Sequence, residues 1–283
     1  LHPRVRRQRQ MCIRDRLNNV FIDIIMFKYA LIFIGGNVMN KGFTLAEVLI
    51  TLGIIGAVAA MTIPNLIQSY KEKEYTAKLK KFYSVMENAG RLVEEEYGSV
   101  DSWGLANSFV ENDSTPQEQI DAKEKSKEIF WKRYSKFIHL TEQKGSNIET
   151  IYGMDKKSKL STAGQLKRFW TFNDGTTVRT TWLQASSTNC SNNNSCGDLS
   201  IDLNGSNGPN AVGRDIFFFE ITKNGIKPMG YKGTKVRPFE QWCIRGQEGA
   251  YNGYGCTAWV IYNENMDYLH CDGLGWDKKN RCR

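Results

Sequence analysis

The most apolar part of the chain is residues 43–63, a run of 21 positions with one charged residue, Glu47. At about 1.5 Å per residue, a helix over this run is about 31 Å long, enough to cross the hydrocarbon core of a bilayer. Pro64 follows directly, and we expect it to kink or loosen the helix because it lacks an N–H and clashes with an earlier carbonyl. The pattern predicts a membrane-spanning helix with Pro64 at its exit.

Beyond Pro64 the pattern becomes that of an amphipathic helix. Apolar and aromatic residues recur at spacings of three and four, which is typical of a helix with one buried face. These residues are Ile67, Tyr70, Leu79, Phe82, Tyr83, Met86, Ala89, Val93 and Tyr97. We expect one helix over about 44–97 that ends at Gly98 and buries this stripe against a globular head. The lysines between 71 and 81 are expected on a solvated face or in salt bridges within a filament.

The rest of the chain predicts a helix followed by strands. A helix is expected over about 116–140, with a charged, solvated first half, and residues 145–164 are expected to be a loop. Strand patterns follow at 168–172, 176–182, 199–203 and 215–221. The first two flank Asn173-Asp174-Gly175, which is a hairpin signal. A long helix followed by antiparallel strands indicates an α+β fold.

The distribution of charged residues along the chain is more informative than the overall composition. The chain is 41% hydrophobic and 24% charged, which is typical of globular proteins and argues against disordered and polytopic membrane classes. The formal charge of +8 favours nucleic acid or an anionic membrane, but most of it comes from residues 1–42. Residues 1–38 carry six arginines; we expect a non-native prefix, with a basic targeting arm as the alternative. Met39 is then the expected start, and nucleic acid is not an expected partner.

The most specific motif lies at residues 39–50. A short basic leader ends at Gly42, Phe43 follows, and Glu47 stands at the fifth position from Phe43 within the apolar run. Together with a proline at position 64, this combination resembles the N-terminal signal of type IV prepilins and type II secretion pseudopilins. The resemblance implies a pilin-like fold, with a long N-terminal helix packed on an antiparallel sheet and disulfide-tied C-terminal loops.

The resemblance also implies how these residues act. A prepilin peptidase at the cytoplasmic membrane face cuts after Gly42, whose missing side chain lets the backbone enter, and methylates the new N-terminal amine of Phe43. Glu47 then pairs with that amine on a neighbouring subunit, because an unpaired carboxylate in lipid is costly. Glu47 and Pro64 are therefore the expected assembly residues. A Glu47 that is protonated or snorkels to the interface is the alternative.

The motif divides the chain into a leader, 39–42, an assembly helix, 43–97, and a head, 98–283. Lys41 places the N-terminal side in the cytoplasm by the positive-inside rule, so the head lies outside it. A secretory signal cut near Ala57-Val58-Ala59 is the competing interpretation, but such signals have a shorter apolar core without a charge.

The expected function is that of a structural subunit, a minor pilin or pseudopilin, in a type IV pilus or a type II secretion pseudopilus. It would be a single-pass inner-membrane protein before it enters the filament. Its expected partners are other pilin or pseudopilin subunits, prepilin peptidase, the inner-membrane assembly platform and the lipid bilayer. The alternative is a signal-anchored periplasmic binding protein or enzyme. Secretion, adhesion, motility and DNA uptake are not distinguished by one chain.

A Gly- and Asn-rich loop between two predicted strands offers oxygen ligands. They are Asp202, Asn204, Asn210 and Asp215. Calcium prefers such oxygens, and the loop resembles a signature in pseudopilin heads, some of which bind calcium in a C-terminal loop. An EF-hand is excluded, because Gly213 stands where a bidentate Glu is needed. The favoured alternative is a polar connection in which Asx turns satisfy the backbone.

Six of the seven cysteines lie in the last hundred residues. They are Cys190, Cys196, Cys243, Cys256, Cys271 and Cys282. The head is expected in an oxidising compartment, where disulfides form, and Cys190 and Cys196 are close enough for a local bridge. The other four allow three pairings. Zinc is disfavoured, because no C-x-x-C pair exists and only His270 adjoins a cysteine.

We do not expect an enzyme. The sequence has no G-x-S-x-G, H-E-x-x-H, Walker or dinucleotide-binding motif. The C-terminal aromatic residues are expected to pack under disulfide-tied loops, with a carbohydrate or protein contact surface as the alternative. They are Trp242, Trp259, Tyr262, Tyr268 and Trp276.

Overall fold

The computed structural model describes residues 44–105, 116–144, 150–160, 168–183, 190, 195–205 and 207–282. The chain divides into two compact units, Leu1–Thr62 and Ile63–Arg283, and each is described by itself. Gly42 and Phe43, where cleavage is predicted, the predicted leader and residues 1–38 lie outside the described residues.

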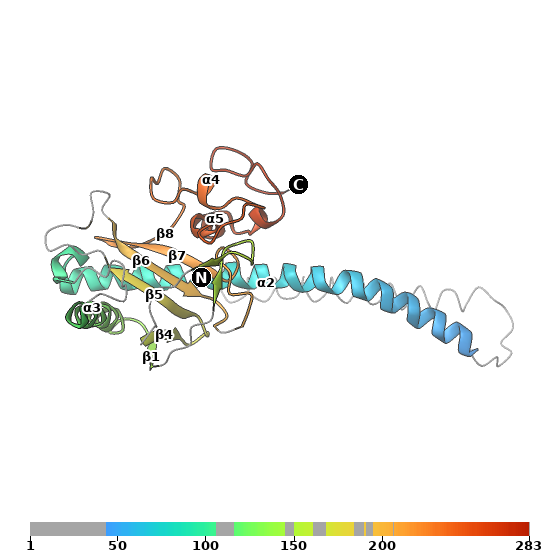
Figure 1. Cartoon of the computed structure of the whole chain (residues 1–283), viewed down its shortest axis with the longest axis horizontal. Helices are drawn as coiled ribbons and strands as arrows, with labels where there is room; N and C mark the ends of the chain where they lie inside the picture. Colours follow the sequence, from blue (N-terminus) through green and yellow to red (C-terminus); the bar gives the residue numbers. More distant parts are fainter. Residues whose placement is uncertain are drawn as a thin grey trace, which may run out of the picture. The chain divides into compact units, whose positions relative to one another are not determined.

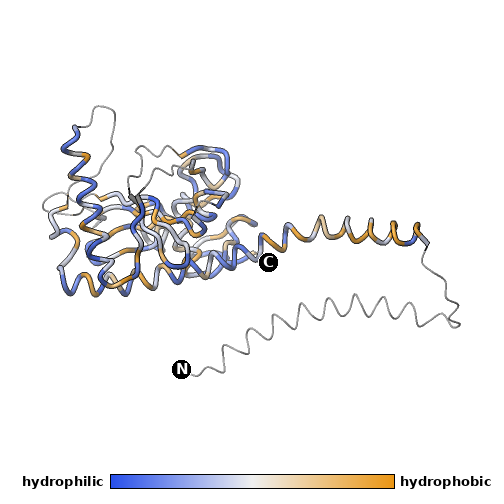
Figure 2. The backbone as a smooth tube through the Cα atoms, turned by 90° about the horizontal axis from the view of Figure 1, so that it is seen from below, coloured by the Kyte–Doolittle hydropathy of each residue, from blue (hydrophilic) through white to orange (hydrophobic). Residues whose placement is uncertain are grey.

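The dominant element is the helix α2, Leu45–Tyr97, which is 53 residues long. It continues through Pro64 and ends at Gly98, whose φ of 74° and N–H bond to the Glu94 carbonyl at 2.9 Å form a left-handed C-terminal cap. The predicted helix and its end are therefore confirmed. Figure 2 shows that hydrophobic residues predominate in its N-terminal part.

The head contains a six-stranded antiparallel sheet with the order β1-β4-β5-β6-β7-β8 (Figure 1). Its strands are β1 Leu140–Lys144, β4 Arg168–Phe172, β5 Thr177–Leu183, β6 Ser195–Asp202, β7 Ile216–Thr222 and β8 Gly225–Pro228. Trp170 of β4 pairs with Val178 of β5, so the predicted hairpin around Asp174 is confirmed. The interior strands β6 and β7 are buried along their whole length, as expected for strands covered on both faces.

Alternation along β7 divides the core into two parts. Phe219 faces α2 and lies 5.2 Å from the Phe82 ring, whereas the neighbouring Phe218 stacks on Tyr254 of the C-terminal region at 3.8 Å. Successive strand residues point to opposite faces, so one strand serves both clusters. The larger cluster includes α2 residues such as Leu79 and the smaller one includes Tyr254. The α+β, pilin-like arrangement of a long helix on an antiparallel sheet is therefore confirmed.

The segment before the hairpin differs from the prediction. The helix α3 is Gln117–Tyr134, shorter than expected, because Leu140–Lys144 pairs with β4 as an edge strand. Cross-strand pairing thus overrides the helical pattern there. The charged half of α3 is not wholly solvated either, since Lys123 and Ser126 are each only 4% exposed. Residues 145–164 also contain more structure than expected: β2, Ile151–Tyr152, pairs with β3, Lys159–Leu160.

A short 3-10 helix, η1 Val100–Trp103, follows α2. Short helical elements also form the C-terminal region; they are α4 Phe239–Trp242, η2 Tyr254–Cys256, α5 Thr257–Asn263 and η3 Asp267–Leu269. α5 lies against β7 and β8, whereas α3 lies against β5, so the two helices are near different strands of the sheet in Figure 1. Thr257 fixes α5 to the sheet by accepting a hydrogen bond from the Phe218 N–H at 3.1 Å.

Candidate assembly site

The N-terminus of α2 forms a capping box. The Thr44 N–H and hydroxyl each donate to Glu47 Oε2 at 2.9 Å, and the Glu47 N–H donates to Thr44 Oγ1 at 3.3 Å. This reciprocal arrangement satisfies two N–H groups that the first turn of a helix leaves free. The pattern T-x-x-E was visible in the sequence and gives Glu47 a local structural role beside its expected role in assembly. Its pairing with the Phe43 amine stays a prediction, because Phe43 lies outside the described residues.

The helix surface beyond the capping box is apolar and exposed. Leu52 and Ile54 are 61% and 60% exposed, and none of the most apolar 18-residue window of α2 is buried. A Cβ built on Gly53 or Gly56 meets no described atom within 4 Å. An apolar helix with small residues on its surface suits close packing against other helices in lipid. This segment has the length and composition to insert into a membrane.

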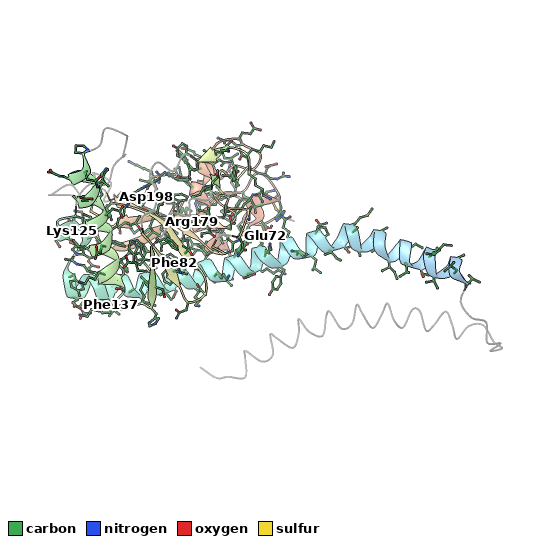
Figure 3. The ribbon with its side chains drawn as sticks, turned by 60° about the horizontal axis from the view of Figure 1, so that its bottom comes forward. Glu72, Phe82, Lys125, Phe137, Arg179 and Asp198 are labelled. Carbon is green, nitrogen blue, oxygen red and sulfur yellow. A yellow bond between two sulfur atoms is a disulfide. The ribbon has the colours of Figure 1, made fainter. Side chains whose placement is uncertain are left out.

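The second half of α2 buries its stripe against the sheet. Leu79 and Met86 are fully buried, and Phe82 is 3% exposed, with its ring 5.1 Å from that of Phe172 in β4. Figure 3 labels Phe82 on this part of the helix. Burying side chains of this size contributes about 1.5–3 kcal/mol each. The amphipathic pattern thus correctly predicts which face of the helix the head covers.

The lysines of α2 do not all lie on a solvated face. Lys81 pairs with Asp174 in the β4–β5 turn at 3.0 Å, and Lys80 pairs with Glu264 after α5. Lys78 bonds to the Leu203 carbonyl at 3.2 Å. The side chains of Lys80 and Lys81 are 42% and 65% exposed, so this part of the basic run is solvated as expected, whereas Lys78 is 25% exposed. Salt bridges within a filament stay a prediction. These three lysines contact the β4–β5 turn, the connection after β6 and the segment after α5.

A histidine makes a further contact to α2 from the C-terminal region. His270 Nε2 lies 3.0 and 2.9 Å from the two carboxylate oxygens of Glu72. Gln68 also donates to Glu72 at 3.0 Å, so the carboxylate is held from its own helix and from the head. His270 therefore joins the C-terminal region to α2.

Three disulfides connect the six C-terminal cysteines. They join Cys190 to Cys196, Cys243 to Cys256, and Cys271 to Cys282. The local bridge was predicted, and the structure selects one of the three pairings left open for the other four. The two cysteines of each bridge are at most 13 residues apart in the sequence, so each bridge closes a local loop and does not link distant elements.

The C-terminal aromatic residues mostly pack inside the head. Trp259 is fully buried, and Tyr268 is 2% exposed and donates its hydroxyl to the Gly213 carbonyl at 2.7 Å. Trp276 is partly buried and donates to the Gly230 carbonyl at 3.0 Å. Tyr262 is the exception, with 55% of its surface exposed. Packing under loops therefore describes this group better than a continuous aromatic surface.

The predicted ligand loop lies between β6 and β7. Asp202 accepts hydrogen bonds from Arg179 of β5, and Asp215 accepts from the N–H groups of Asn210 and Ala211. Asn204 donates to the Tyr75 hydroxyl of α2 at 3.0 Å, and its own N–H bonds to Asp202 in an Asx turn. Among the described residues, no group of three or more His, Cys, Asp or Glu side chains could hold a metal. The geometry is that of a polar connection, and calcium there stays a prediction.

These features define a class: a protein with a pilin-like α+β fold, whose long N-terminal helix has one half apolar and exposed and the other half packed on the sheet. A model described as the prokaryotic N-terminal methylation motif matches residues 38–63. It agrees with the predicted prepilin-type signal and implies processing by a prepilin peptidase.

The particular family follows from the rest of the chain. The chain belongs to the family described as Family of unknown function (DUF6613), whose model matches residues 65–271. That match covers the second half of α2 and nearly all of the head. Searches among curated proteins and among solved structures gave no match.

Proposed function

We propose that this protein is a minor pilin or pseudopilin, a structural subunit of a type IV pilus or a type II secretion pseudopilus. The observation that carries the proposal is the methylation motif at residues 38–63, which adjoins a helix whose apolar start is exposed and whose continuation packs on a sheet. Neither a soluble enzyme nor an ordinary secreted protein needs a retained apolar helix of this kind. The long head, most of the chain, favours a minor or specialised subunit.

The proposal assigns an order of events to the N-terminal residues. The leader stays in the cytoplasm while the apolar helix inserts into the membrane, and prepilin peptidase cuts after Gly42 and methylates Phe43. Glu47 is first held by the Thr44 capping box. During assembly its carboxylate attracts the Phe43 amine of a neighbouring subunit, because opposite charges attract strongly in a low-dielectric environment. The proposed role is structural, and no catalytic residue is assigned.

Processing provides the first test. The full chain is expressed with a prepilin peptidase, extracted from membranes, and analysed by mass spectrometry of its N-terminal peptide. We expect a peptide that starts at N-methylated Phe43. Gly42→Val should block cleavage, because a branched side chain would stand at the cut, whereas Gly53→Val, within α2, should leave cleavage unchanged. An intact Met39, or a start after Ala59, would contradict the proposal and favour a signal-anchored or secreted protein.

Assembly provides the second test, which separates Glu47 from processing. Glu47→Ala should still be cleaved and inserted, but it should be lost from sheared filaments or from crosslinked complexes with other subunits. Glu94→Ala, which removes an acid from the same helix at its distal end, is the matched control and should assemble normally. Equal incorporation of both variants would show that Glu47 acts only as a helix cap.

A further inference from the structure

The loop between β6 and β7 brings three kinds of oxygen atom to one point. The Asp202 carboxylate, the Gly205 carbonyl and the Asn210 side-chain oxygen all accept hydrogen bonds from the same side chain. A carboxylate, a backbone carbonyl and an amide oxygen are also the donor types that surround Ca²⁺ in proteins. Three oxygen atoms of these types, close together, form the kind of surroundings that a bound cation needs.

The group at their centre is the guanidinium of Arg179, which comes from β5 (labelled in Figure 3). Its Nε donates to Asp202 Oδ2 at 3.0 Å, and its Nη2 donates to the same oxygen at 2.6 Å. Nη2 also lies 3.0 Å from the Gly205 carbonyl and 3.1 Å from Asn210 Oδ1. One planar cation thus contacts all three oxygens through charge-assisted hydrogen bonds.

Burial makes this cation essential to the loop. The Arg179 side chain is 7% exposed and the Asp202 side chain is 0% exposed. Water is therefore excluded from both groups, and the guanidinium lies within hydrogen-bonding distance of the carboxylate. A buried ionised carboxylate needs a positive partner, and removing that partner costs far more than the pair contributes.

The remaining loop residues do not complete a calcium site. Both oxygens of Asp215 accept backbone N–H groups, Oδ2 from Asn210 at 2.9 Å and Oδ1 from Ala211 at 2.7 Å. Gly213, at the twelfth position from Asp202, has a φ of 71°, and a Cβ there would lie 3.0 Å from the Cys256 sulfur. A side chain that closes the coordination sphere, such as Glu, therefore cannot stand at that position.

We propose that Arg179 is the permanent cation of this loop: it occupies the position that a divalent cation would take, so the loop is ordered without calcium and excludes it. The specificity of the site thus depends on a residue outside the loop, 23 positions before Asp202 in the sequence. The loop connects β6 to β7 and contacts Tyr75 of α2, so its order also supports the packing of the helix on the sheet.

Thermal unfolding of the full chain in detergent tests the proposal. The wild-type midpoint should be the same in EGTA and in about 1 mM free Ca²⁺, a concentration that fills typical extracellular calcium modules. Arg179→Ala should lower the midpoint in EGTA by about 5 °C or more, because it leaves Asp202 buried without its partner. Added Ca²⁺ should then restore much of this loss, since a small cation can take the vacated position. Arg179→Gln, which keeps most of the side-chain volume, should respond in the same direction.

Two controls isolate the site. Arg179→Ala combined with Asp202→Asn should lose the response to Ca²⁺, because the carboxylate that attracts the cation is gone. Arg245→Ala removes the same charge from an exposed pair with Asp272 and should show no response. A wild-type midpoint that rises with Ca²⁺ and falls with EGTA would overturn the proposal. So would a lack of response in both Arg179→Ala and Arg179→Gln.

Discussion

The two halves of α2 belong to one helix, yet they meet opposite surroundings. Leu52 and Ile54 in the first half are 61% and 60% exposed, whereas Leu79 and Met86 in the second half are fully buried. The first half is apolar on every side, so lipid or other helices are needed to cover it. The second half has a single stripe of apolar residues, which the sheet covers. The number of apolar residues in a helix therefore does not by itself determine how much the helix stabilises the fold. The arrangement of apolar residues around the helix decides whether they stabilise the head or remain available for assembly.

Matched truncations in the two halves give the sharpest test of this comparison. Phe82→Ala should reduce the free energy of unfolding by about 3–5 kcal/mol, because it leaves a cavity between Phe172 and Phe219. Ile54→Ala should change it by less than about 0.5 kcal/mol, since its side chain contributes nothing to the head core. Denaturant unfolding of the full chain in detergent, followed by tryptophan fluorescence, measures both. Similar losses in the two variants would contradict the distinction.

The disulfides extend the comparison to the C-terminal region, which has few regular elements. Cys243→Ser together with Cys256→Ser opens a loop of 13 residues and should cost about 3 kcal/mol. The same double change at Cys271 and Cys282 opens a loop of similar length and should cost a similar amount if chain entropy dominates. Thermal midpoints of both variants, with the wild type under reducing conditions as reference, measure the losses. A negligible loss for Cys243 and Cys256 would show that packing alone orders this region.

The sequence predicts the helix far better than it predicts the loops of the head. α2 and its end at Gly98 follow from periodicity, and the Cys190–Cys196 bridge follows from proximity, because both signals are local. The strand β1 and the hairpin β2–β3 were missed, since their pairing depends on neighbours rather than on their own pattern. The Arg179–Asp202 contact joins positions 23 residues apart, so spacing within the loop indicated the ligand oxygens but not the cation. At the assembly site, the pattern T-x-x-E would have been enough to predict the capping box. The pairing of Glu47 with a neighbouring subunit involves a second chain, so the sequence of one chain does not show its geometry.

Acid should weaken a polar contact between the β2–β3 hairpin and the C-terminal loop. Asp155 accepts hydrogen bonds from Ser158, Lys157 and Gly249. Burial raises its pKa, but these bonds outweigh that effect and hold the pKa well below the usual range for an aspartate. Because the folded-state pKa is the lower one, Asp155 stabilises the fold fully above the unfolded-state pKa of about 3.9, and this contribution is lost as the pH falls below that value.

The Asp155→Asn variant isolates this contribution from the other carboxylates. Compared with the wild type, it should be less stable by a constant amount above about pH 5, and the difference should shrink as the pH falls below about 4. Urea unfolding of both proteins across this pH range gives the two curves, and Asp277→Asn at an exposed position serves as the control. A difference that stays constant down to the lowest pH would show that the ionised form of Asp155 is not what the hydrogen bonds stabilise.

The smallest effect is expected where charge, rather than apolar area, joins α2 to the head. Lys81 pairs with Asp174 at 3.0 Å, but the Lys81 side chain is 65% exposed, so water and salt screen the attraction. Lys81→Ala should therefore cost about 0–1 kcal/mol, and the cost should fall further as salt is added. A double-mutant cycle with Asp174→Ala, measured by urea unfolding at low and high salt, isolates the pair from the hydrogen bonds that Asp174 also makes within its turn. A coupling energy between Lys81 and Asp174 above about 2 kcal/mol, insensitive to salt, would contradict this prediction. The ion pair would then stabilise the packing of α2 on the sheet about as much as a buried side chain such as Phe82 does. The buried apolar residues of α2 would then not be the main source of its attachment to the sheet.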